Sequence, residues 1–118
     1  MGGVVPYTAY NARRSYIEEN PDIIEKFTRA INKGLQYVYE HDAKEIASII
    51  VDYFPDTSLA DMEVIINRYK EGEAWKRNIT INQEEWDHIQ EIIEASGELD
   101  EYVPYDKLIY NKYFDDYE

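Results

Sequence analysis

The stretch ENPDIIEKFTRAINKGLQYVYEH, residues 19–41, decides the fold expected for this chain of 118 residues. Asn20 is a good N-cap, and Pro21 suits the first helical position because the N–H that it lacks would have no partner there. Apolar residues then recur at helical period on one face: Ile23, Ile24, Phe27, Ala30, Ile31, Gly34, Leu35 and Val38. We therefore predict one core helix of about 20 residues, roughly 30 Å long.

Two residues of this helix carry further expectations. Glycine inside a helix costs up to about 1 kcal/mol relative to alanine, so we expect another backbone to come close at Gly34. His41 ends the stretch, where a positive charge suits the helix dipole, and we therefore predict a capping role for it.

Three further helices are predicted downstream by start and stop signals. The expected caps are Asp42, Ser58 and Asn82, and the expected breakers are Pro55, Gly72 and Gly97. Apolar residues between them, at helical spacing, are expected to face inward. They are Ile46, Ile49, Ile50 and Tyr53 in the first helix, Leu59, Met62, Ile65, Ile66 and Tyr69 in the second, and Trp86, Ile89, Ile92 and Ile93 in the third. One or two short helices are expected between Pro104 and Tyr117.

The run VVPYTAY, residues 4–10, differs from the rest because it is short, β-branched and aromatic. It predicts an extended strand, for which the helical remainder offers no pairing partner. The expected fold is therefore mainly α, with four to five main helices and one N-terminal extended strand. We expect a single helical domain over residues 1–118, divided into the strand (1–12), a helical body (13–97) and an acidic, tyrosine-rich helical tail (98–118).

Composition excludes several classes of function. With 12 Lys+Arg against 25 Asp+Glu, the net charge of -13 argues against nucleic acid and anionic membranes as partners. The absence of cysteine excludes disulfides and thiolate chemistry. The N-terminus has neither the positive nor the apolar region of a signal peptide, and no stretch approaches a membrane span. The chain as it stands is expected to be soluble, without an export signal.

Motifs for catalysis are weak. The five glycines never fall at phosphate-loop spacing, and the serines have no nucleophile-elbow context. Glu85 and His88 form one Glu-x-x-His step, whereas a di-iron bundle needs two such steps and further inward glutamates. His88 is more simply a surface residue among acids. We therefore expect no enzyme activity, no catalytic residue, no metal ligands and no cofactor.

Four segments together resemble a known family. They are VPYTAYNARRSYIEENPDIIEKFTRAINKGLQYVYEHDAKEIA (5–47), FPDTS (54–58), INRYKEGEAWKRN (66–78) and ASGELDEYVPYDKLI (95–109). In this order and spacing they are similar to the C-terminal part of substrate-binding proteins of ABC importers, in the nitrate, sulfonate and thiamine-precursor class. The family often has tryptophan at the position of Tyr37, a departure that an aromatic core position should absorb.

The resemblance implies a type II periplasmic-binding-protein fold with two lobes, in which residues 4–10 would be the hinge strand that crosses between lobes. It also implies a parent lipoprotein that is extracellular, membrane-anchored or periplasmic, and that passes a small solute to an ABC permease. Most of the family's ligand site would lie in segments upstream of this chain. Only Tyr7, Thr8 and Tyr10 would reach the cleft, and the alternative for them is plain strand pairing in a sheet.

Two readings of the isolated chain remain. An exposed strand edge invites pairing, so a homodimer through the N-terminal strand is expected. The rival to solute capture is a self-standing acidic module for protein–protein interaction, in which the tail docks a basic partner. Residues 98–118 hold seven acids and two lysines, which favours such docking.

Overall fold

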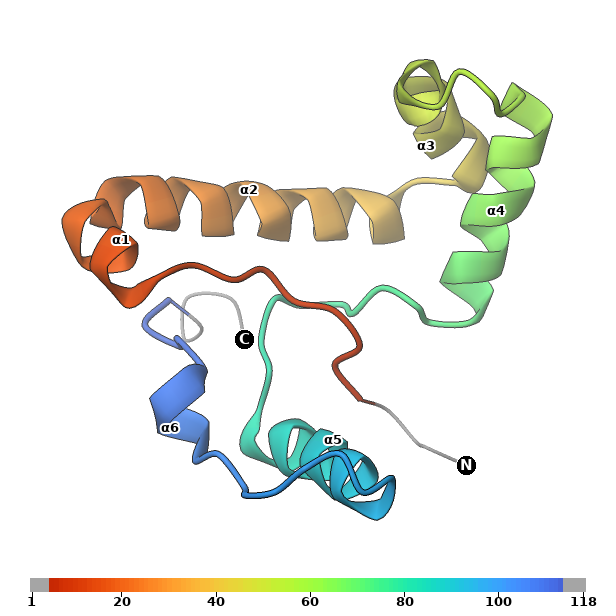
Figure 1. The fold of residues 1–118 in the computed structure, drawn as a ribbon. Helices are drawn as coiled ribbons and strands as arrows, with labels where there is room; N and C mark the ends of the chain where they lie inside the picture. Colours follow the sequence, from red (N-terminus) through yellow and green to blue (C-terminus); the bar gives the residue numbers. More distant parts are fainter. Residues whose placement is uncertain (1–4, 114–118) are drawn as a thin grey trace. The chain divides into compact units, whose positions relative to one another are not determined.

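The computed structural model describes residues 5–113, and Figure 1 shows its helices. In chain order they are α1 (Arg14–Glu19), α2 (Pro21–Glu40), α3 (Ala43–Ile50), the 3₁₀ turn η1 (Val51–Tyr53), α4 (Leu59–Glu71), α5 (Gln83–Ala95) and α6 (Tyr105–Leu108). The mainly helical class is confirmed, and the predicted core helix begins at Pro21 as expected.

The N-terminal strand is not supported. Residues 5–13 have no regular secondary structure, and no strand occurs anywhere in residues 5–113. An extended run becomes a strand when its N–H and C=O groups pair with a neighbouring strand, and the described part of the chain offers none. Val4 lies outside the described residues. The homodimer expected through this segment stays a prediction.

The chain divides into two compact units, each described here by itself. One unit comprises the chain up to Ile24 and from Thr80 onward, and the other comprises Glu25–Ile79. The expectation of a single domain over residues 1–118 stays a prediction.

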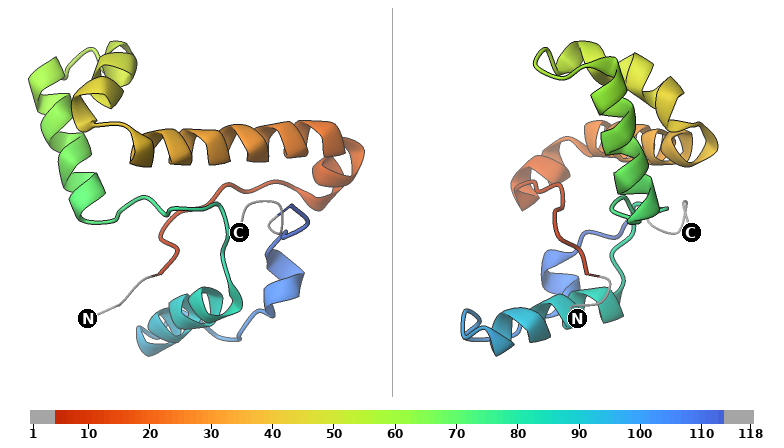
Figure 2. Two further views of the ribbon diagram at one scale, coloured as in Figure 1. Left: turned by 180° about the vertical axis from the view of Figure 1, so that it is seen from behind. Right: turned by 90° about the vertical axis from the view of Figure 1, so that its right-hand side faces the viewer.

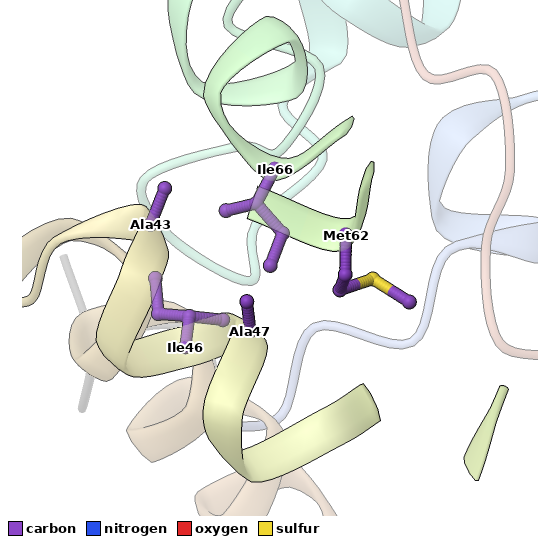
Figure 3. Packing of buried hydrophobic residues seen from close by; sticks show 5 residues of the cluster. All are labelled: Ala43, Ile46, Ala47, Met62 and Ile66. Atoms are coloured by element: carbon purple, nitrogen blue, oxygen red, sulfur yellow. The ribbon is translucent and has the colours of Figure 1, made fainter. Parts of the chain in front are cut away.

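The apolar core of the second unit lies between α3 and α4. The two helices lie side by side in both views of Figure 2. Figure 3 shows Ala43, Ile46 and Ala47 from α3 facing Met62 and Ile66 from α4, and all five side chains are buried. Alanines on α3 let the helices approach closely, so that the larger Ile66 fills the space between them and is only 1% exposed.

Helix starts follow the predicted caps. The Asp42 carboxylate accepts a hydrogen bond from the Glu45 N–H (2.8 Å), and Ser58 Oγ accepts one from the Asp61 N–H (3.1 Å). Asn82 forms a full capping box, because Glu85 also accepts a hydrogen bond from the Asn82 N–H (3.0 Å).

Helix ends also follow their breakers. Gly97 has a φ of 80° after α5, and its N–H donates to the Glu94 carbonyl (2.9 Å) while the Glu98 N–H donates to Ile93 (3.2 Å). These two bonds form a Schellman motif, for which glycine is the favoured residue. Gly72 ends α4 as expected, and α3 gives way to η1 before Pro55.

The inward faces are smaller than the periodicity predicts. Ile49 and Tyr53, expected inside, are 53% and 80% exposed. In α2 the single buried residue is Asn32, and Ile23 and Phe27 on its apolar stripe are about half exposed. An apolar stripe becomes core only where another element covers it. Although α2 is the longest helix, neither it nor any other helix within residues 5–113 is long and apolar enough to cross a membrane.

The expectation of a close backbone at Gly34 is wrong for the described chain. A Cβ built on Gly34 meets no atom within 4 Å, so the glycine lies beside open space.

The α3–α4 core predicts unequal effects of two neighbouring substitutions. Ile66→Ala should lower the free energy of unfolding by about 2–5 kcal/mol, because it opens a cavity at a buried position. Ile65→Ala, at a side chain that is 40% exposed, should cost less than about 1 kcal/mol. Denaturant titration followed by circular dichroism measures both. Equal losses in the two variants would contradict this core.

The two glycines predict effects of opposite sign. Gly34→Ala should stabilise the chain by about 0.5–1 kcal/mol, because alanine favours the helix and has room there. Gly97→Ala should destabilise it by about 1 kcal/mol, because alanine disfavours a φ of 80°. Thermal unfolding of both variants tests this, and a destabilised Gly34→Ala variant would restore the idea of a close backbone.

Candidate functional site

The predicted ligand residues lie together in the segment that precedes α1. Tyr7 and Tyr10 are 93% and 75% exposed, and Thr8 between them is exposed as well. The preceding Val5 and Pro6 are half-buried. The segment therefore presents two aromatic rings and three hydroxyl groups to solvent, which suits binding better than core packing.

Contacts within the first unit anchor this segment. The Asn11 side chain donates to the Ala9 carbonyl (3.1 Å) and shapes the approach to α1. In α1, Arg14 donates to the Lys107 carbonyl in α6 (3.3 Å). Where α1 ends, the Asn20 side chain donates to the Tyr16 carbonyl (3.0 Å) and closes the helix. The tyrosines thus sit on a chain segment whose C-terminal end is tied to a helix.

Hydrogen bonds from buried and half-buried side chains hold the tail against α5 in the same unit. Gln90 is 3% exposed and makes two hydrogen bonds to Val103, accepting from its N–H (2.6 Å) and donating to its carbonyl (3.2 Å). Trp86 Nε1 donates to the same carbonyl (2.7 Å), and the Tyr105 hydroxyl donates to the Ile81 carbonyl (2.6 Å). Sequence reasoning missed Gln90, although a lone polar residue four positions after Trp86, on an apolar face, was a usable signal.

Tyrosines of the tail have structural partners. Tyr102 donates its hydroxyl hydrogen to Glu94 Oε2 (2.7 Å), and this hydrogen bond is the largest cause that raises the pKa of Tyr102 to about 12. Tyr110 and Tyr113 contact each other edge to face. The part of the tail after residue 113 lies outside the described residues.

His41 takes the predicted position at the end of α2. Its Nδ1 lies 2.9 Å from the Tyr37 carbonyl oxygen, one turn back, and its ring stacks on the Tyr37 ring with centroids 3.6 Å apart. The Tyr37 hydroxyl donates to Glu45 (2.9 Å), which raises the pKa of Tyr37. Lys70 on α4 donates to the His41 carbonyl (2.5 Å) and satisfies a second group at the helix end. These contacts confirm the capping role.

A second aromatic group lies around the C-terminal end of α4 in the same unit. Tyr69 and Trp75 contact edge to face with centroids 5.2 Å apart, and the Tyr39 hydroxyl donates to the Trp75 carbonyl. The Arg77 guanidinium lies 4.6 Å above the Tyr39 ring. These contacts hold the segment after α4 against the end of α2, so we assign these side chains a role in stability.

The second histidine is not part of a metal site within the described residues. His88 Nδ1 lies 3.4 Å from Glu91 on the exposed side of α5. No group of three potential metal ligands occurs in residues 5–113. A depression beside His88 is lined by the cap residue Asn82 and by side chains of α5 up to Glu91, most of which are acidic.

Comparison with known proteins gives these observations a context. Residues 4–45 match the family model described as "NMT1/THI5 like". Over 107 residues, 91% of this chain, the sequence is 41% identical to "Putative binding protein YtlA" of Bacillus subtilis (strain 168). The chain is thus similar to this family over residues 4–45 and to this binding protein over most of its length. It spans 32%, about a third, of the YtlA length, and no solved structure matches it significantly.

The NMT1/THI5-like match and the predicted ligand residues overlap in the sequence. The matched region, residues 4–45, includes the exposed tyrosine segment, α1 and α2, and ends in the first turn of α3. The relative's name describes binding rather than chemical conversion. The resemblance to substrate-binding proteins that the sequence landmarks indicated is therefore confirmed.

Proposed function

We propose that this chain is part of a solute receptor of an ABC importer, which captures a small solute without covalent chemistry. The observation that carries the proposal is the 41% identity with a binding protein over 91% of the chain. The NMT1/THI5-like match over residues 4–45 supports the same conclusion. The receptor works at the outer face of the membrane, anchored or periplasmic, and hands its solute to a permease.

The solute contacts of this chain are Tyr7, Thr8 and Tyr10. All three side chains are exposed in the described chain, and each carries a hydroxyl group. A tyrosine ring stacks on a flat heterocycle such as the pyrimidine of a thiamine precursor, and hydroxyl groups donate to sulfonate or nitrate oxygens. The remaining contacts come from the other parts of the receptor, since the chain spans about a third of its relative.

The rival function is a self-standing acidic module whose tail binds a basic protein. The described tail uses Tyr102 and Tyr105 in contacts within its own unit, which leaves fewer aromatic groups for a partner. Solute capture is therefore the better supported of the two.

The size of the native polypeptide separates these functions. An antibody raised against this chain should detect a membrane-associated band well above 14.0 kDa in the source organism. Such a band follows from the relative's greater length. A freely soluble band at 14.0 kDa would replace solute capture by the interaction module.

Substitutions in the tyrosine segment test the ligand contacts in the polypeptide of native length. Titration calorimetry with a small alkanesulfonate, nitrate and an aminopyrimidine identifies the solute class. Tyr7→Ala, Thr8→Ala and Tyr10→Ala should each weaken binding of that solute about tenfold, the loss of one charged hydrogen bond or stacking contact. Tyr16→Ala is the control, because Tyr16 is also partly exposed but lies on α1. Unchanged binding in all three variants would remove these residues from the site.

A further inference from the structure

We propose that the turn between α3 and α4 is a docking surface for a partner protein that presents an amphipathic, basic segment. The turn belongs to the second unit, and the solute contacts lie in the first. Solute capture does not require this surface, so the proposal goes beyond the proposed function and stands or falls separately.

Large apolar side chains are gathered on this turn. Tyr53 is 80% exposed, and Ile49, Phe54 and Leu59 are each about half exposed. Ile49 lies in the last turn of α3, Tyr53 ends η1, Phe54 follows it, and Leu59 begins α4. All four lie within residues 49–59, next to the buried contact between α3 and α4. A concentration of exposed apolar groups of this kind is typical of a protein-binding surface.

The turn is held in a defined conformation. The Phe54 N–H donates to the Val51 carbonyl (2.9 Å), and the Thr57 N–H donates to the Phe54 carbonyl (3.0 Å). Ser58 then caps α4, donating to the Asp61 carboxylate (2.7 Å) and accepting from its N–H (3.1 Å). A surface ordered before binding loses less conformational entropy when a partner arrives.

Charge around the turn selects the partner. Residues 42–65 contain six acids and one cation, Lys44. Some of the acids have local roles, as Asp42 and Asp61 do at helix caps. The carboxylates of Asp52 and Asp56, which flank Tyr53 and Phe54, make no hydrogen bond or ion pair with another residue of the described chain. They are therefore available to cations on a partner.

The same charges disfavour other occupants. A second copy would bring its own Asp52 and Asp56 carboxylates against those of the first, and the negative charges would repel each other. An anionic membrane would repel the same carboxylates. A helix with leucines on one face and lysines beside them would instead place apolar groups against Tyr53 and cations against Asp52 and Asp56.

Two synthetic helical peptides with the same leucine pattern test this surface, one carrying lysine and the other glutamate at the polar positions. Each is titrated by fluorescence anisotropy against the polypeptide of native length. The lysine peptide should bind at least tenfold more tightly than the glutamate peptide, and added salt should weaken it. No binding, or equal binding of the two peptides, would overturn the proposal.

Two pairs of variants locate the binding on the turn. The double variant Tyr53→Ser and Phe54→Ser should weaken the lysine peptide at least tenfold without changing charge, whereas Leu108→Ser, at an exposed leucine of α6, should not. Asp52→Asn with Asp56→Asn should weaken it several-fold, and Glu18→Gln with Glu19→Gln, an equal charge change on α1, should not. Equal losses in test and control variants would indicate diffuse electrostatic attraction and reject the site.

Light scattering and vesicle flotation cover the other occupants. The turn variants should leave the oligomeric state unchanged, and vesicles of phosphatidylglycerol should not bind the polypeptide through this turn. Dimers that dissociate in the Tyr53→Ser and Phe54→Ser variant would assign the surface to a second copy. Circular dichroism checks that each variant folds. If the Tyr53→Ser and Phe54→Ser variant does not fold, the variant with Asp52→Asn and Asp56→Asn still tests the proposal, because it removes no apolar group.

Discussion

Packing of Ile66 and Met62 against three small or medium side chains of α3 is the interaction on which the second unit depends. Only Ala43, Ile46, Ala47, Met62 and Ile66 form the buried apolar cluster of the described chain. Because this cluster removes little apolar surface from water, hydrogen bonds at the helix ends contribute a larger share of the stability of the unit. Asp42 and Ser58 cap α3 and α4, and Lys70 and the His41 ring satisfy carbonyl groups where α2 ends.

The first unit relies on polar contacts in a similar way. Gln90 is buried and matches both backbone groups of Val103, so the tail follows α5 without a strand or a long helix to hold it. A buried side-chain amide without hydrogen-bond partners would destabilise the unit. The Gln90 amide has partners for both its oxygen and its nitrogen, which fixes a single arrangement of the tail on α5. The exposed tyrosine segment before α1 belongs to this unit.

Both proposals rest on large aromatic side chains that are exposed to solvent. Tyr7 and Tyr10 in one unit, and Tyr53 in the other, lie on surfaces that the described chain leaves uncovered. The relative is about three times as long, so the chain aligns with only a part of it. The surface at Tyr53 differs from the tyrosine segment because Asp52 and Asp56 lie beside it in the sequence, so charge as well as apolar area defines what it can contact.

Local chemistry in the sequence determined where helices begin and end. The caps at Asp42, Ser58 and Asn82 and the glycine at 97 act through hydrogen bonds and dihedral angles within a few residues, so they were predictable without tertiary information. The spacing of landmarks likewise indicated the family and directed attention to Tyr7, Thr8 and Tyr10. Tertiary structure alone decided that Ile66 is core while Tyr53 is exposed, that Gly34 faces open space and that residues 5–13 form no strand. Burial and strand pairing depend on which distant segments come near, and helical or alternating periodicity carries no record of that.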